Sequence, residues 1–128
     1  MIDHIGLAVS NMERSKAFYV DAFRPLGIAI VMEVTAEQTG ADAHAGFGKD
    51  DKAFFWIGGG AKPKGGTHVA FTAPTRTDVD AFYHAALAAG GRDNGPPGLR
   101  PHYDSNFYGA FVLDPDGNNI EASCRKPA

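Results

Sequence analysis

Alternating apolar and polar residues predict short β-strands in both halves of the chain. The strands expected from this period-two pattern and from β-branched content lie at 2–9, 28–34, 43–48, 53–57, 67–73, 107–113 and 118–124. Apolar residues at helical spacing predict helices over 12–23 and 75–89, each preceded by polar capping residues. The polar stretch 35–42 is expected to be a loop. The Gly/Pro-rich stretch 90–103 is expected to hold at most a short strand.

This order of elements repeats halfway along the chain. His4 and His68 are 64 positions apart (68 − 4 = 64), and the same offset relates a group of further pairs. These pairs are Ala17-Phe18-Tyr19 with Ala81-Phe82-Tyr83, Gly27 with Gly91, Phe47 with Phe111, and Asp50 with Asp114. The two halves align without a gap, so we predict a duplicated module. The expected fold is α+β, one domain of two tandem βαβββ modules at about 1–60 and 66–128, joined by a linker over 58–66.

Strand alternation predicts that both histidines face away from the helices. In the first strand of each module the apolar partners, such as Ile5 and Val69, share the helix side, whereas His4 and His68 lie on the opposite side. A tight turn over 114–117 would place Ala110 opposite Glu121. Glu121 then shares the face of the histidines.

The same reasoning assigns faces to the remaining residues. Tyr108 and Asn119 are expected beside Glu121, and Phe111 is expected on the helix side. By the 64-residue offset, His44 takes the place of Tyr108 and Ile57 takes the place of Glu121. Phe55 lies on the face of Ile57, and Trp56 would then face the helix. We therefore expect a curved, mostly antiparallel sheet cleft with helices outside, whose inner surface is mostly apolar with a few polar groups, as in small-molecule sites.

Composition narrows the class of protein further. The net charge of −3 provides no basic surface for nucleic acid. No apolar run approaches the roughly 18 residues of a membrane span, and we expect no signal peptide. Cys124 is the only cysteine, so an intrachain disulfide is excluded and a reducing cytoplasm is the expected location. We expect a small molecule as the partner.

Four motifs stand in order along the duplicated modules: Asp3–Val9, Ser15–Tyr19, His68–Phe71 and Asp114–Glu121. Together they resemble the vicinal oxygen chelate superfamily, which includes glyoxalase I, extradiol ring-cleaving dioxygenases, fosfomycin-resistance enzymes and bleomycin-resistance proteins. The resemblance covers nearly the whole chain. It implies a site in which the first and last strands of each module supply metal ligands.

Carried over to this sequence, the resemblance implies that His4, His68 and Glu121 hold one divalent metal ion. The fourth position falls on Ile57, where glyoxalase I has a glutamate, so true glyoxalase I activity is not expected. The remaining two histidines and one carboxylate resemble the ligand set of the extradiol dioxygenases. Fe²⁺ is the usual metal of such a set, with Zn²⁺, Mn²⁺ and Ni²⁺ as alternatives.

Further residues are candidates for roles around this metal. Tyr108 and His44 are candidates for proton transfer. The candidates for substrate binding are Phe55, Ile57, Arg100, Tyr103 and Asn119.

Two functions stay open at this point. One is a metal-dependent enzyme, a lyase or dioxygenase acting on a small oxygenated molecule. The other is a metal-free protein that sequesters a small molecule, as bleomycin-resistance proteins do. We expect a homodimer. In the family the modules pair within one chain or between chains, and in the second case His4 shares a site with the partner subunit's His68 and Glu121.

Overall fold

The computed structural model describes residues 1–40, 42–60 and 62–128. The loop expected over 35–42 and the linker expected over 58–66 each include one residue outside this described part. The first module contains β1 (Ile5–Ala8), α1 (Met12–Phe23), the 3-10 turn η1 (Arg24–Leu26), β2 (Ala29–Val34), α2 (Ala36–Thr39), β3 (His44–Lys49) and β4 (Lys52–Gly58). The second contains β5 (His68–Thr72), α3 (Arg76–Ala88), β6 (Arg92–Leu99), β7 (Tyr108–Leu113) and β8 (Asn119–Cys124).

Both long helices begin at side-chain caps. The Asn11 side chain accepts a hydrogen bond from the Arg14 backbone N–H, and Thr75 accepts one from Asp78. Helix α2 was not predicted, and β6 is longer than the short strand expected there. The short helix α2 starts from a capping box in a stretch expected to be a loop, and β6 runs through the Gly/Pro-rich stretch for eight residues.

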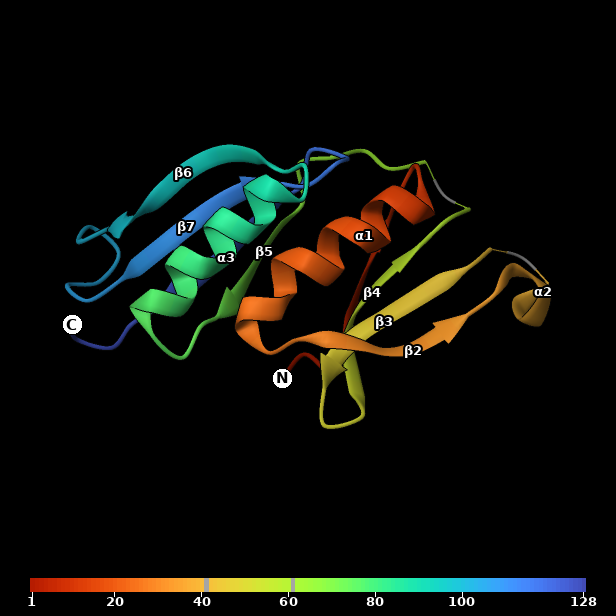
Figure 1. Cartoon of the computed structure of the whole chain (residues 1–128), viewed down its shortest axis with the longest axis horizontal. Coiled ribbons are helices and arrows are strands. Elements are labelled where there is room, and N and C mark those ends of the chain that lie inside the picture. Colours follow the sequence, from red (N-terminus) through yellow and green to blue (C-terminus); the bar gives the residue numbers. More distant parts are fainter. Residues whose placement is uncertain (41, 61) are drawn as a thin grey trace.

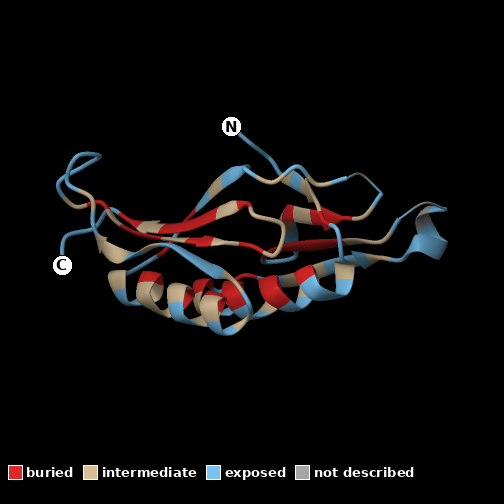
Figure 2. Cartoon of the chain, turned by 90° about the horizontal axis from the view of Figure 1, so that it is seen from above, coloured by how far each residue is buried: buried red, intermediate tan, exposed pale blue. Residues whose placement is uncertain are grey.

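The strands form two four-stranded sheets, in the orders β1-β4-β3-β2 and β5-β8-β7-β6. In each sheet the first strand is parallel to the last, and the other neighbours are antiparallel. Figure 1 shows α1 and α3 side by side, and Figure 2 shows both helices along one side of the molecule. The predicted α+β fold of two tandem βαβββ modules is confirmed. In the described part of the chain β1 and β5 are both sheet edges and do not pair with each other.

The repeat contains a shift of one residue. In the first module Gly6 pairs with Trp56, and in the second Ala70 pairs with Glu121. The first strands are therefore related by 64 positions (70 − 6 = 64), but the last strands by 65 (121 − 56 = 65). The predicted alignment without a gap is wrong, and Trp56, not Ile57, is the structural counterpart of Glu121.

The extra residue enters between Gly91 and β7. Strand β6 has two register shifts against β7, and such irregularities absorb an added residue without breaking the sheet. Ala45 pairs with Ile57, and its counterpart Ala110 pairs with Ala122. The same shift makes Gly109 the counterpart of His44, so the match of His44 with Tyr108 was also wrong. The matches of Phe47 with Phe111 and of Asp50 with Asp114 in the sequence are coincidental.

The last hairpin is also one residue out of the predicted register. Phe111 pairs with Glu121, and Ala110 does not. The cause is the turn, which has five residues instead of four, because the Asp114 N–H donates to the Asn118 carbonyl and extends the loop. Since alternate residues lie on opposite faces, this change moves Phe111 to the helix-free face.

The two modules share one core beneath the helices. Its centre is a cluster of five aromatic rings from both modules: Tyr19, Phe23, Phe47, Phe55 and Phe71. Phe71 comes from β5 of the second module, yet its ring centroid lies 4.8 Å from that of Phe23 and 5.4 Å from that of Phe55. The modules are therefore joined by buried aromatic packing as well as by the linker.

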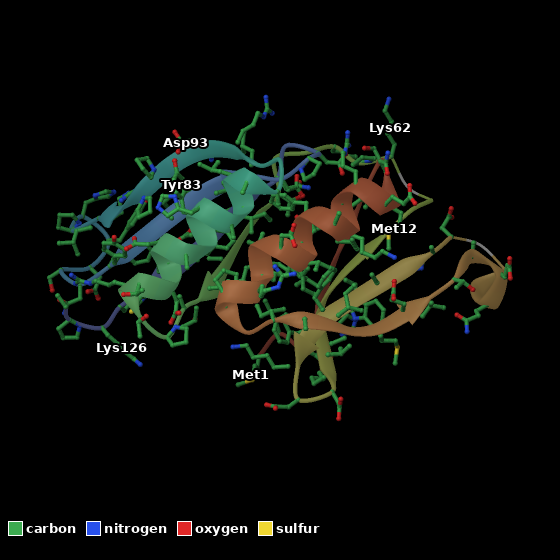
Figure 3. The ribbon with its side chains drawn as sticks, in the orientation of Figure 1. Met1, Met12, Lys62, Tyr83, Asp93 and Lys126 are labelled. Atoms are coloured by element: carbon green, nitrogen blue, oxygen red, sulfur yellow. The ribbon has the colours of Figure 1, made fainter. Side chains whose placement is uncertain are left out.

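A buried carboxylate fastens the turn between β7 and β8 to helix α1. The Tyr19 hydroxyl donates to Asp114 Oδ2 at 2.5 Å. Asp114 also accepts from the backbone N–H groups of Asp116 and Asn118 and from the Asn118 side chain. Burial, together with the Asp114 carboxylate, raises the pKa of Tyr19 well above its usual value. Tyr83, the counterpart of Tyr19, makes a different contact and donates to Asp93 at 3.0 Å (Figure 3).

We expect Asp114→Ala to lower the free energy of unfolding by about 2–3 kcal/mol, because it leaves buried donors of the turn and of Tyr19 without an acceptor. Urea unfolding followed by circular dichroism measures this change. Asp104→Ala is the matched control, since Asp104 is exposed and its side chain accepts one local N–H, from Asn106. Equal losses in the two variants would contradict a specific role for Asp114.

Candidate functional site

A histidine–glutamate pair lies on the helix-free face of the second sheet. His68 begins β5 and Glu121 lies in the parallel neighbour β8. The distance from His68 Nε2 to Glu121 Oε1 is 2.7 Å. The Glu121 side chain is only 5% exposed, whereas that of His68 is 51% exposed. A buried carboxylate needs a compensating partner, and here the partner is an imidazole that remains open to solvent.

Phe111 and Arg100 lie beside this pair. The Phe111 ring centroid is 6.2 Å from that of His68, and the Arg100 guanidinium carbon is 5.5 Å from the centroid of the Phe111 ring. Arg100 also donates to the carbonyls of Pro96 and Gly98, which fix its orientation. Arg100 was predicted as a substrate-binding residue from its loop position. Sequence reasoning missed Phe111 because of the register error.

Asn119 supplies an acceptor next to the pair. It pairs with His68 in the strand register and therefore lies on the face of Glu121. Its side-chain oxygen is buried and has no hydrogen-bond partner within the described part of the chain. Buried polar atoms are normally satisfied, so the donor that this oxygen lacks has to come from a water or a ligand.

His4, the third predicted metal ligand, does not join the pair within one chain. Its Nδ1 lies 2.7 Å from Asp3 Oδ1, and the same oxygen accepts from Lys52 Nζ at 2.7 Å. The hydrogen bond from Lys52, assisted by His4, lowers the pKa of Asp3. Among the described residues, no three His, Cys, Asp or Glu side chains are grouped closely enough to hold a metal ion.

The first module carries no carboxylate at the place of Glu121. Trp56 occupies that place and lies on the helix-free face, although it was predicted to face the helix. Phe55 and Ile57, predicted to line the substrate site, are instead fully buried in the core against α1. The one-residue shift between the modules is the cause of all three errors. His44 lies on the helix-free face as predicted, on the same side of its sheet as Trp56.

Tyr108 is on the wrong side of the sheet for the role predicted for it. Its hydroxyl donates to Asp80 Oδ1 of α3 at 2.6 Å, and Arg76 lies over its ring. The hydrogen bond to Asp80 raises the pKa of Tyr108. The prediction that Tyr108 shares the face of His68 is therefore wrong. Tyr103 is 62% exposed, and its ring contacts His102 and Phe107.

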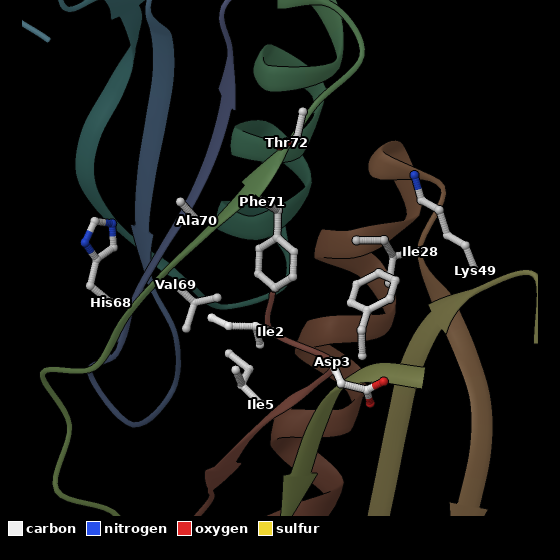
Figure 4. Close-up of a pocket in the computed structure, with 11 residues that line it drawn as sticks. Ile2, Asp3, Ile5, Ile28, Lys49, His68, Val69, Ala70, Phe71 and Thr72 are labelled. Atoms are coloured by element: carbon white, nitrogen blue, oxygen red, sulfur yellow. The ribbon is translucent and has the colours of Figure 1, made fainter. Parts of the chain in front are cut away.

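A cavity of about 650 Å³ lies between the two modules (Figure 4). Its walls are mostly apolar, with Ile5 and Phe54 from the first module and Phe71 from the second. Asp3 and His68 are among its polar lining residues. The cavity therefore reaches His68 and offers room for a small organic molecule.

The donor types of the pair fit a divalent transition metal. Imidazole nitrogen and carboxylate oxygen both suit Fe²⁺, Mn²⁺, Zn²⁺ and Ni²⁺, and the 2.7 Å contact places His68 Nε2 and Glu121 Oε1 side by side. They provide two ligands. A third ligand would have to come from a side chain that the fold of one chain does not bring to this pair.

The chain therefore combines two βαβββ modules with a histidine and a carboxylate on the helix-free face of the second sheet. The chain matches the family model of the Glyoxalase/Bleomycin resistance protein/Dioxygenase superfamily over residues 1–122, and it belongs to this superfamily. No curated protein matches the chain in a sequence comparison. In the described part of the chain no helix is long and apolar enough to cross a membrane.

The fold is shared with many solved structures, among them the following three. A glyoxalase/bleomycin resistance protein from Albidiferax ferrireducens is 29% identical, with a TM-score of 0.79, and the match covers 96% of this chain and 98% of that one. A glyoxalase I mutant from Zea mays is 21% identical, with a TM-score of 0.74 over 95% of this chain and 46% of that one. A mutant fosfomycin resistance protein from Listeria monocytogenes, complexed with Mn(II) and 1S,2S-dihydroxypropylphosphonic acid, is 18% identical. Its TM-score is 0.69, with 95% and 90% of the chains covered.

Proposed function

We propose that this chain is a metal-dependent enzyme that acts on a small oxygenated molecule. His68 and Glu121 would hold one divalent ion, with Fe²⁺ as the first candidate and Zn²⁺, Mn²⁺ and Ni²⁺ as alternatives. The observation that carries the proposal is the contact between the exposed imidazole of His68 and the buried carboxylate of Glu121. The Mn(II) complex of the Listeria monocytogenes protein, which has the same fold, supports it by analogy.

A homodimer would complete this site. His4 is held by Asp3 within its own chain, and β1 and β5 are unpaired edges in the described part of the molecule. Pairing of these edges between two copies would bring His4 of one copy to His68 and Glu121 of the other. Twofold dimers are the commonest assembly of soluble proteins. The buried free thiol of Cys124 fits a reducing compartment, and we propose the cytoplasm.

The chain's own residues then bind and orient the substrate. Arg100, fixed by two carbonyls above Phe111, presents a cation to an anionic or carbonyl oxygen. The buried, unpaired oxygen of Asn119 would accept a substrate hydroxyl once its side chain turns outward, and Phe111 shields one side of His68 from water. A divalent ion held there supplies Lewis-acid polarisation of neighbouring substrate oxygens.

Elemental analysis of protein purified without chelator or affinity metal tests the proposal. We expect about one Fe, Mn, Zn or Ni per chain, and Glu121→Ala should reduce metal affinity at least roughly 100-fold, since even indirect support of a metal is worth up to that much. His84→Ala is the matched control, because His84 is an exposed histidine on α3. No metal in the wild-type protein, even after anaerobic loading with Fe²⁺, would leave the metal-free sequestration protein as the function to pursue.

A further inference from the structure

On the helix-free face of the first module, two aromatic rings each pack over a glycine. The Trp56 indole covers Gly46, where an added Cβ would lie 2.9 Å from both Cη2 and Cζ2 of the indole. The His44 ring covers Gly58 in the same way, where an added Cβ would lie 2.3 Å from its Cδ2. Both glycines belong to strands, where a missing side chain often marks the close approach of another group. The missing side chains leave room for both rings on the sheet.

A cavity of about 230 Å³ opens beside these two rings. Gly6, His44, Trp56 and Gly58 all line it. Engineered apolar cavities of about 150 Å³ already accept benzene, so this volume suits a single ring with one or two substituents. Trp56 is only partly buried. It therefore offers part of its surface to a ligand, with the imidazole of His44 close by as a polar group.

The strand register fixes the position of Trp56 relative to the first strand of its module. Trp56 stands beside Gly6 as Glu121 stands beside Ala70, and Gly6 and Ala70 each lie two residues after a histidine of the same face. In a completed site Trp56 would therefore flank His4 as Glu121 flanks His68. An aromatic wall would take the position at which the second module has a metal-binding carboxylate.

We propose that Trp56, with His44, forms a stacking platform that selects ligands carrying a planar aromatic ring. The ring of the ligand would lie against the exposed part of the indole, in an offset or edge-to-face arrangement. A puckered, saturated ring would make apolar contacts there but would lack the stacking with the indole. As a statement about the substrate of the metal site, this inference rests on the proposed function, since Trp56 would wall that same site. Ring binding by itself needs no metal.

The test uses metal-free protein, treated with chelator, and two probes of equal size, phenol and cyclohexanol. Trp56 is the only tryptophan of the chain, so the single indole N–H signal in an NMR spectrum reports this site alone. We expect phenol to shift the signal in a saturable manner and cyclohexanol to bind about tenfold more weakly, the value of an aromatic pair. Equal affinities for the two probes would overturn the platform.

Three variants separate stacking from general apolar contact, with phenol affinity measured by ligand-observed NMR. Trp56→Leu should lose about tenfold in phenol affinity, and Trp56→Phe should retain most of it. Gly46→Ala should weaken binding although Trp56 is present, because the new Cβ displaces the indole. Unchanged phenol affinity in Trp56→Leu would overturn the inference. Metal content is measured separately on the untreated wild type. Expected phenol binding without any bound metal would contradict the proposed metal site but not the stacking platform.

Discussion

Ile57→Glu is expected to unfold most of the protein, whereas Trp56→Glu at the adjacent position is expected to leave it folded. Ile57 is fully buried between the first sheet and α1. A glutamate there would lose the apolar packing of isoleucine and bury an unpaired carboxylate. The expected loss exceeds about 4 kcal/mol, which is a large part of the stability of a domain of this size.

Trp56→Glu changes a side chain on the helix-free face. A carboxylate there remains in contact with solvent, because the cavity beside Trp56 is open and the neighbouring strand positions are glycines. We expect a loss of less than about 1 kcal/mol in the free energy of unfolding. Thermal unfolding of the two variants under one set of conditions compares them directly. If the order of stability is reversed, the register that places Trp56 opposite Gly6 is wrong.

Mixing two variants that each lack one metal ligand is expected to restore metal binding. In a dimer with shared sites, His4→Ala removes a ligand from one copy and Glu121→Ala removes a ligand from the other. A mixed dimer then has one site with both ligands lost and one site that is intact. With random pairing, half of the dimers are mixed, so the metal bound should reach roughly a quarter of the wild-type amount.

The control for mixing is a pair of variants that damage the same half of the site. His68→Ala mixed with Glu121→Ala should restore nothing, because both residues belong to the same copy in every site. Metal content is measured after the chains are unfolded together and refolded. Absence of recovery with His4→Ala and Glu121→Ala, in variants that each remain folded, would contradict a site shared between two copies.

The sequence alone determined most elements of this protein and their order, but not the short helix α2 or the full length of β6. Helix α1 begins after Asn11 and ends at Phe23 as predicted, because its apolar spacing and its cap are local properties of the chain. The faces of His4 and His68 also followed from alternation within single strands. The pairing of two strands, by contrast, depends on the length of the connection between them.

Only the tertiary structure decided the register, and with it the site. One additional residue before β7 and a five-residue turn after Leu113 each moved a strand by one position. A shift of one residue exchanges the two faces of a strand, so Trp56 and Phe111 moved to the helix-free face while Ile57 moved into the core. Such shifts are set by backbone hydrogen bonds, such as that from Asp114 to Asn118, and these are not visible in a pattern of apolar and polar residues. The separation of His4 from His68 and Glu121 is likewise a property of how the modules pack, since Phe71 joins their cores while β1 and β5 remain unpaired in the described part of the chain.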